Sequence, residues 1–215
     1  MKPTNTLQEP AFSPSYDNKI FRKFSVRTLE AKIENKLLFQ QELGWVAEAK
    51  IPLLCIPGGM SEPQGGKSFK EVLEGILSLN CQILVIGKGS EEFGKIFTTL
   101  EREYPHRVKI LRDDETLERK MYAASDLGLF FSGAESEELL NCLSYGTVPV
   151  SPAHPLLHDY NPVQESGNAF LADPQTPWSW FAALVRGLET YKLPYDFRTI
   201  QRQAMESVQG NEERE

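Results

Sequence analysis

The chain has 215 residues, enough for one domain with a full hydrophobic core. Hydrophobic residues make up 40% of it and charged residues 25%, the profile of an ordinary globular protein. Its net charge of −7 excludes the basic surface that a nucleic-acid binder needs, and it disfavours binding to an anionic membrane.

The cysteines and the first residues bear on the cellular compartment. Cys55, Cys81 and Cys142 each lie in an apolar segment and form no C-x-x-C pair, so neither a disulfide framework nor a zinc site is indicated. The first ten residues, MKPTNTLQEP, lack the apolar centre of a signal peptide. We therefore expect reduced thiols in a cytoplasmic protein, with no metal and no cofactor.

The chain begins with an irregular segment. Residues 1–24 contain three prolines and no helical period, so we expect a lead-in without regular structure. A helix is predicted to start near residue 28, because Leu29, Ile33 and Leu37 recur every four residues. Gly44 follows as a signal that ends the helix.

From residue 51 onward, short apolar runs alternate with helical patterns. The apolar runs predict strands at residues 51–56, 83–86, 108–111, 127–131, 147–150 and 169–171. Helical spacing predicts helices at residues 69–77, 91–103, 114–124, 135–145, 177–188 and 197–208. Strands that are apolar throughout need cover on both faces, so an α/β fold with a doubly wound parallel sheet is predicted. We place this domain at residues 25–208 and a frayed tail at residues 209–215.

Four segments carry a family resemblance. They are SVRTLEAKIENKLLFQQELG (25–44), IGKG (86–89), YAASD (122–126) and SYGTVPV (144–150). In order and spacing they resemble the K-x-x-N-K-x-x-L-Q, L-G-x-G, Y-A-x-x-D and R-Y-G-T-x-P-V patterns in the C-terminal domain of GT-B glycosyltransferases of the glycogen/starch synthase family. The resemblance implies a Rossmann-like, nucleotide-sugar-binding type of domain, related to retaining enzymes that transfer glucose from ADP-glucose to an α-1,4-glucan. It also implies that the family's N-terminal domain is absent from this chain.

The loop after the first strand differs from the family pattern. In the family it reads S-R-L-x-x-Q-K-G, and its Arg and Lys hold the diphosphate of ADP-glucose. Here residues 56–67 read IPGGMSEPQGGK, which puts Gly58 or Gly59 at the Arg position. If Gln64 and Gly66 align with the family's Q and G, the Lys position falls on Gly65. Our candidates for nucleotide-sugar binding are Gly58, Gly59 and Lys67, which lies two residues after Gly65. The alternative is a flexible glycine loop; a P-loop is disfavoured because its first glycine is replaced by serine.

The next two strands end in further candidates. Gly87 and Gly89 allow a tight turn at which a ligand can approach the backbone, although plain turn formation explains them equally well. The family's I-G-Y segment helps to hold the nucleotide, and here LRD (111–113) takes its place. Its Arg112 is a candidate phosphate or base contact.

The catalytic loop of the family reads S-x-x-E-P-C-G-L. The corresponding residues 132–140 read SGAESEELL, so the resemblance makes Glu135 the catalytic candidate and Ser132 a binding candidate. The alternative role of Glu135 is a carboxylate that favours the start of a helix. Glu137 and Glu138 lie in the same helical turn, and their charges oppose a bound diphosphate.

Two further patterns have simpler explanations. The family's T-G-G-L is replaced by AHPLL (153–157), in which Pro155 lacks an N–H donor. His154 and His158 flank this proline without an H-E-x-x-H pattern, so we interpret them as loop residues rather than metal ligands. Trp178 and Trp180 fit packing in the core or at the edge of the domain, with a sugar-stacking platform as the alternative.

These departures separate three hypotheses. The first is an ADP-glucose-dependent glucosyltransferase completed by another chain; the second is a non-catalytic module that binds a nucleotide or nucleotide sugar; the third is a protein-interaction domain. Because five family features are altered around one cleft, we expect impaired or no autonomous catalysis. The expected ligands are ADP-glucose or ADP. The expected partners are a separate chain with the N-terminal half, or a second copy in a homodimer that covers an apolar face.

Overall fold

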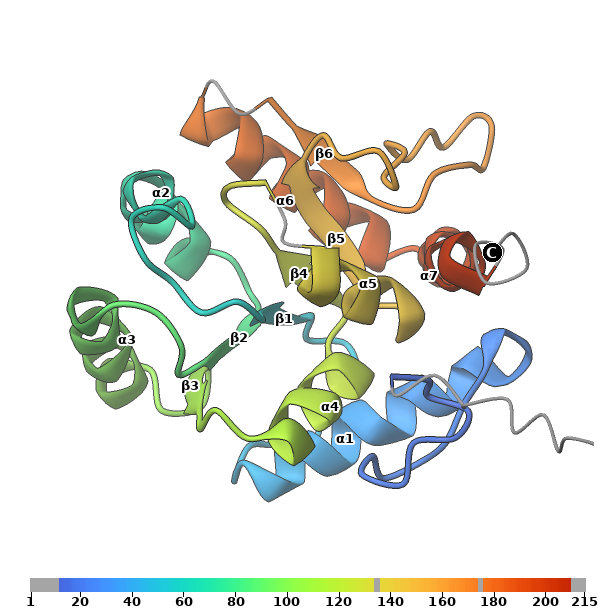
Figure 1. The fold of residues 1–215 in the computed structure, drawn as a ribbon, viewed down its shortest axis with the longest axis horizontal. Helices are drawn as coiled ribbons and strands as arrows, with labels where there is room; N and C mark the ends of the chain where they lie inside the picture. Colours follow the sequence, from blue (N-terminus) through green and yellow to red (C-terminus); the bar gives the residue numbers. More distant parts are fainter. Residues whose placement is uncertain (1–11, 134–135, 174–175, 210–215) are drawn as a thin grey trace, which may run out of the picture.

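A computed structural model describes residues 12–133, 136–173 and 176–209 (Figure 1). Six parallel strands form one sheet in the order β3-β2-β1-β4-β5-β6. The strands are β1 (Leu53–Ile56), β2 (Gln82–Ile86), β3 (Val108–Leu111), β4 (Leu127–Leu129), β5 (Val148–Pro152) and β6 (Phe170–Ala172). This order is that of a Rossmann-like sheet, so the predicted doubly wound α/β fold is confirmed.

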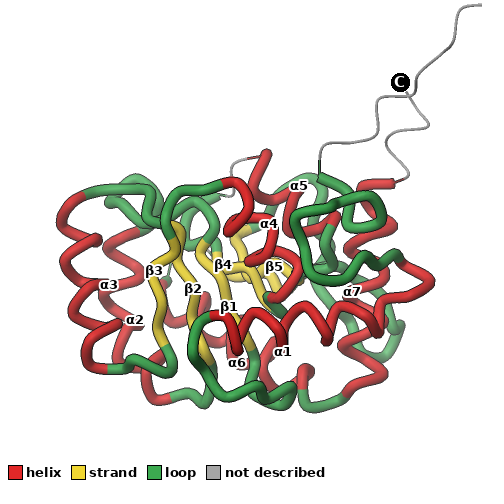
Figure 2. The backbone as a smooth tube through the Cα atoms, turned by 90° about the horizontal axis from the view of Figure 1, so that it is seen from below, coloured by secondary structure: helices red, strands yellow, loops and turns green. Residues whose placement is uncertain are grey.

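Helices cover both faces of the sheet (Figures 1 and 2). They are the 3-10 helix η1 (Val26–Ala31) and the α-helices α1 (Lys32–Glu42), α2 (Gly66–Ser78), α3 (Glu91–Glu103), α4 (Glu115–Ala124), α5 (Ser136–Ser144), α6 (Pro177–Tyr191) and α7 (Pro194–Gln209). Apolar side chains of α2, α3 and α6 form one core cluster, those of α1, α4 and α5 form another, and α7 contributes to both. The two clusters explain why the strands are apolar throughout.

The entry helix begins earlier than its apolar spacing indicated. Ser25 caps η1, where its side chain accepts a hydrogen bond from the Arg27 N–H and its own N–H donates to Thr28 Oγ1. Gly44 follows α1 with a φ of +74°, a left-handed conformation that glycine adopts without steric cost. The predicted stop at Gly44 is therefore confirmed.

The strand predicted at 127–131 ends two residues early, at Leu129. Phe131 instead stacks on Trp180, with the ring centroids 3.8 Å apart. The indole N–H of Trp180 donates to the Phe130 carbonyl at 3.0 Å. The Phe130 N–H still donates to the Val150 carbonyl of β5 at 3.0 Å, so contacts with α6 hold only Phe131 outside the sheet, although the sequence run is apolar to its end.

Residues 12–25 form turns, and their buried Ile20 and Phe24 pack into the core cluster of α1, α4 and α5. The buried Asp17 accepts a hydrogen bond from the Tyr145 hydroxyl. All three cysteines are buried and free. Among the described residues no helix combines the length and apolarity needed to cross a membrane.

Candidate nucleotide-sugar site

The candidate binding residues gather at the carboxyl ends of β1, β2 and β4. The chain continues from β1 to β2 on one side of the sheet centre, whereas β4 lies on the other side of β1. This reversal is the topological switch point, where ligands bind in open parallel sheets. In this sheet the switch point is where the loops after β1 and β4 meet.

The glycine loop after β1 is closed on itself. Gln64 Nε2 donates to the Gly58 carbonyl at 2.7 Å, and the Ser61 hydroxyl donates to Gln64 Oε1 at 2.9 Å. The Gly66 N–H donates to the Ser61 carbonyl at 3.0 Å. Hydrogen bonds inside the loop therefore take up groups that could otherwise reach a ligand.

Two of the candidate glycines contact a neighbouring loop. Gly59 has a φ of +69°, and a Cβ there would lie 2.1 Å from the Lys88 carbonyl oxygen. Gly89 has a φ of +109°, and a Cβ there would lie 2.2 Å from the Met60 carbonyl oxygen, which also accepts the Ser90 N–H at 3.1 Å. The loops after β1 and β2 thus press together, and these glycines make that approach possible.

The two positions that carry Arg and Lys in the family differ in the space they offer. Gly58 has no left-handed φ, and a Cβ there would lie 3.3 Å from Gln64 Nε2, the end of a flexible side chain. Gly65 has a φ of +89°, and a Cβ there would lie 2.5 Å from the Phe131 Cβ. A Cβ therefore fits at Gly58 and not at Gly59, so Gly58 is the one of the two positions with room for a side chain. The backbone is closed around the Lys position at Gly65.

Two small cavities contain most of the candidates. One, of about 210 Å³, is lined by Gly58, Gly59 and Ser132 together with Glu138, the one charged residue of its wall in the described chain. The other, of about 240 Å³, is lined by Gly87 and Gly89. Both are smaller than the roughly 300–1,000 Å³ typical of small-molecule sites.

Carboxylates dominate the charge at this edge. Lys88, beside the second cavity, lies 3.4 Å from an Asp113 carboxylate oxygen and 3.8 Å from one of Glu118. Burial raises the pKa of Glu118, against the lowering effect of Lys88. Glu138 Oε2 is buried and accepts no hydrogen bond from the described residues. The Lys88 cation is thus shared between two carboxylates, and a third carboxylate faces the neighbouring cavity.

The remaining candidates lie apart from these cavities or outside the described residues. Lys67 and Arg112 are exposed, line neither cavity, and make no hydrogen bond or ion pair with the described residues. Glu135, the catalytic candidate, lies outside the part of the chain that the structure describes. The structure therefore brings together Gly58, Gly59 and Ser132, and does not bring Lys67 or Arg112 to them.

The histidines and tryptophans are placed by other contacts. His154 Nδ1 accepts the Leu156 N–H at 3.2 Å, His158 is exposed, and the described residues hold no group of side chains suited to a metal ion. Trp180 is buried, as core packing predicted. Trp178 is 60% exposed and meets Phe181 edge-on, so it packs at the edge of the domain rather than in its core.

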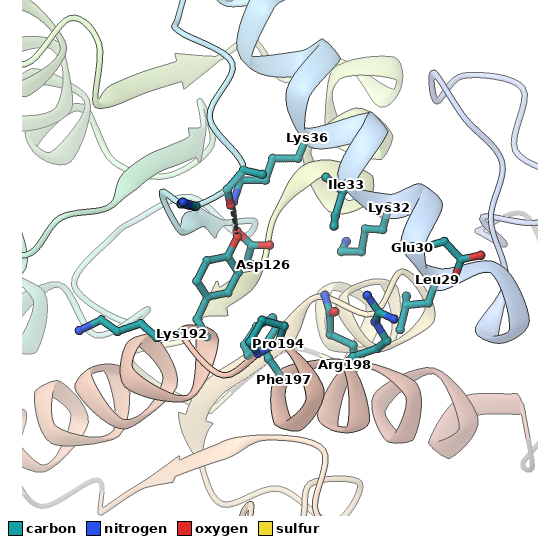
Figure 3. A pocket seen from close by; sticks show the side chains of 14 residues that line it. Leu29, Glu30, Lys32, Ile33, Lys36, Asp126, Lys192, Pro194, Phe197 and Arg198 are labelled. Carbon is teal, nitrogen blue, oxygen red and sulfur yellow. Dashed lines mark hydrogen bonds and ion pairs between the residues drawn. The ribbon is translucent and has the colours of Figure 1, made fainter.

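Buried polar residues of α1 form a network to which the sequence analysis gave no role. Lys36 Nζ donates to Asp126 Oδ2 at 2.6 Å, to the Tyr191 hydroxyl at 2.7 Å and to the Ala49 carbonyl at 3.0 Å (Figure 3). Asp126 Oδ2 also accepts the Leu53 N–H at 2.8 Å. The sequence signal for this network was the recurrence of polar residues every three or four positions along α1, which places them on one face of the helix.

Lys32 is the second buried cation of α1. Its ammonium donates to the carbonyls of Tyr122 at 2.8 Å and Ala123 at 3.2 Å, at the end of α4, and to Thr147 Oγ1 at 3.2 Å. Burial lowers the pKa of Lys32 to about 7, despite the opposing charge of Asp126. Both lysines therefore join α1 to the sheet at the edge opposite the candidate site.

Comparison with known proteins gives the same family as the motifs. The glycogen synthases of Fervidobacterium nodosum and Alkaliphilus metalliredigens are 29% identical over 208 residues and 30% identical over 217 residues. These matches cover 94% and 98% of this chain, but 43% and 46% of those proteins. The chain thus spans under half the length of the curated relatives it matches. No protein-family model matches it.

Solved structures confirm the fold. The catalytic domain of starch synthase IV from Arabidopsis thaliana, bound to ADP and acarbose, superposes with a TM-score of 0.73 at 23% identity, over 94% of this chain and 45% of that one. The C-terminal domain of the group 1 glycosyltransferase LpcC from Francisella tularensis superposes with a TM-score of 0.60 at 17% identity, over 82% of this chain and 92% of that one. The chain is therefore a glycogen synthase-like domain with the C-terminal type of GT-B fold.

Proposed function

We propose that this glycogen synthase-like domain does not by itself transfer glucose from ADP-glucose. The observation that carries the proposal is the backbone at Gly65, where a φ of +89° and the 2.5 Å approach of a Cβ to Phe131 leave no place for the family's lysine. A departing diphosphate needs fixed positive charge in the transition state. Lys88, which lines the second of the two cavities, is already shared by Asp113 and Glu118.

The carboxylates strengthen this proposal. One unit charge about 6 Å from a phosphate charge of the same sign costs roughly 3 kcal/mol at an effective dielectric near 20. Glu138 lines the cavity of about 210 Å³ at the switch point, and its Oε2 accepts no hydrogen bond from the described residues. A sugar diphosphate would meet repulsion where the family offers attraction.

A second proposal keeps weak nucleotide binding without catalysis. Gly58 and Ser132 still line a cavity at the switch point, and the starch synthase with this fold was solved with ADP bound. We propose ADP or ADP-glucose as ligands of this weak site. A separate chain with an N-terminal half, or a second copy of this chain, is the partner we propose, since the chain spans under half of its curated relatives.

Buried, free cysteines support a cytoplasmic location.

Glucose transfer tests the main proposal. The purified chain is incubated with radiolabelled ADP-glucose and glycogen, with the Fervidobacterium nodosum glycogen synthase as the positive control. We expect incorporation at background with this chain and clear incorporation with the control. Incorporation by this chain that Glu135→Ala abolishes would contradict the proposal and identify Glu135 as catalytic.

Light scattering tests the homodimer. A second copy is supported if the measured mass at high protein concentration is about twice that of the chain, and a monodisperse monomer removes this partner.

A further inference from the structure

A cavity of about 410 Å³ lies at the amino edge of the sheet, opposite the candidate nucleotide-sugar site. It opens between η1 and α1 on one side and the junction of α6 with α7 on the other, as Figure 3 shows. Its volume falls within the roughly 300–1,000 Å³ of small-molecule sites, unlike the two cavities at the carboxyl edge. The proposed function gives this cavity no role.

One part of its wall is apolar. Leu29 and Phe197 are buried core residues, and Ile33 and Pro194 continue the apolar surface outward. Ile33 is 46% exposed, so part of this surface meets solvent. An occupant with an apolar body would remove that area from water, which favours binding by roughly 25 cal/mol per Å².

The rest of the wall is cationic. Lys50 and Arg198 are exposed, and their charged groups have no hydrogen bond or ion pair within the described residues. Lys192 also lines the cavity, but its ammonium is paired at 2.6 Å with Glu189, which is not part of the cavity wall. Two positive groups at the mouth are thus available to a ligand.

The floor adds little positive charge. Lys36 is neutralised by Asp126 at 2.6 Å, and Lys32, whose ammonium donates to carbonyl and hydroxyl oxygens, has a pKa lowered by burial to about 7 and is only partly charged at neutral pH. Glu30 and Asp126 are the acids of the wall, against cations at Lys36, Lys50, Lys192 and Arg198. In a chain of net charge −7 this is a local excess of positive charge.

We propose that this cavity binds a small amphipathic anion, with an acidic head held by Lys50 and Arg198 and an apolar body packed against Ile33 and Phe197. The head is a carboxylate or a phosphate, since both match these cations. The site is separate from the cleft, so its occupancy is measurable whether or not the domain binds ADP.

Isothermal titration calorimetry with chemically matched probes tests the proposal. The probes are octyl phosphate and octanoate, with octanol, octyltrimethylammonium and inorganic phosphate as controls. We expect at least one of the two amphipathic anions to bind about tenfold more tightly than octanol, octyltrimethylammonium and inorganic phosphate, and to bind less tightly as salt is raised. Equal binding of octanol, or no binding of either anion at millimolar concentration, overturns the proposal and leaves the cavity to another occupant.

Substitutions place the binding in this cavity. Arg198→Gln and Lys50→Gln should each weaken the tighter anion about threefold to tenfold, because each removes one charge-assisted contact at a solvent-facing rim. Arg102→Gln on α3 is the matched control, since Arg102 is exposed and does not line the cavity. Equal losses in all three variants, or no loss at either rim residue, would show that the anion binds elsewhere.

A second pair of variants probes the apolar wall. Ile33→Asp adds a carboxylate to the wall against which the apolar body packs, whereas Ile33→Asn has nearly the same shape without the charge. We expect Ile33→Asp to weaken the anion at least about fivefold more than Ile33→Asn, because the added negative charge lies in the same cavity as the anion. Equal effects would contradict the binding of an anion in this cavity.

Discussion

The amino edge of the sheet and its carboxyl edge differ in what their polar groups contact. At the amino edge, Lys36 and Asp126 are bonded to each other and to backbone groups of the same domain. At the carboxyl edge, Gly59 and Gly65 stand where the backbone leaves no room for a side chain. The residues of the amino edge that match the family's motifs therefore hold the fold together, whereas Gly59 and Gly65 allow backbone segments to approach closely.

This difference separates fold from activity. Residues such as Lys36 have internal partners, so replacing them would destabilise the domain whatever it binds. Residues that contact only a ligand have no such constraint from the fold. A glycogen synthase-like domain can therefore keep a TM-score of 0.73 to a starch synthase whatever its carboxyl edge binds.

The largest expected effect is on stability at the amino edge. Asp126→Asn leaves the buried Lys36 without its counter-charge, so we expect the free energy of unfolding to fall by about 3–5 kcal/mol in urea denaturation. Glu189→Gln breaks the exposed pair with Lys192 and should cost less than about 1 kcal/mol. Similar losses in both variants would show that the buried pair does not stabilise the domain.

The next effect compares two glycines of one loop. Gly65→Ala introduces a Cβ at a φ of +89° and against Phe131, so we expect a loss of about 2–4 kcal/mol in the free energy of unfolding. Gly58→Ala meets only the end of the Gln64 side chain and should change stability by less than about 1 kcal/mol. If thermal and urea denaturation rank the two variants equally, the loop is not closed as described.

The pH dependence of stability tests the buried Lys32. Its folded pKa of about 7 is below the unfolded value of about 10.4, so the unfolded chain binds more protons between these values. Stability from this group therefore rises as pH increases above 7. Between pH 6.5 and pH 9, the free energy of unfolding of the wild type should rise relative to Lys32→Met by about 2–3 kcal/mol. An unchanged difference would indicate that Lys32 stays charged across this range.

The smallest effect is a partial repair of the cleft. Gly58→Arg places a guanidinium at the position that the family uses, and we expect ADP to bind about fivefold to tenfold more tightly than to the wild type. Gly58→Gln is the matched control without charge and should leave the affinity for ADP unchanged. A gain with glutamine equal to that with arginine would show that the cation is not what the cleft lacks.

The sequence predicted the sheet and its helices because apolar strands and helical spacing are local signals. It did not predict that Phe131 leaves the strand, since the cause is Trp180, far along the chain. It also left the Arg position open between Gly58 and Gly59. That question depended on the approach of the loop after β2, which brings the Lys88 carbonyl against Gly59.

The site was predicted less completely than the fold. Lys67 and Arg112 were chosen by residue type and spacing, but both are exposed and line neither cavity. The cationic cavity at the opposite edge was not predicted, because its residues come from η1, α1, the loops before β1 and β4, and the junction of α6 with α7. Contacts between distant segments decide such sites, and one sequence does not show them.

Calorimetric titration of the unmodified chain with ADP and with ADP-glucose tests the central claim most directly. A closed glycine loop and a shared Lys88 cation predict dissociation constants in the millimolar range or no detectable heat for either ligand. A micromolar dissociation constant for ADP-glucose, abolished by Ser132→Ala or Gly58→Asp, would contradict the account and show that the switch-point cavity still holds a sugar nucleotide.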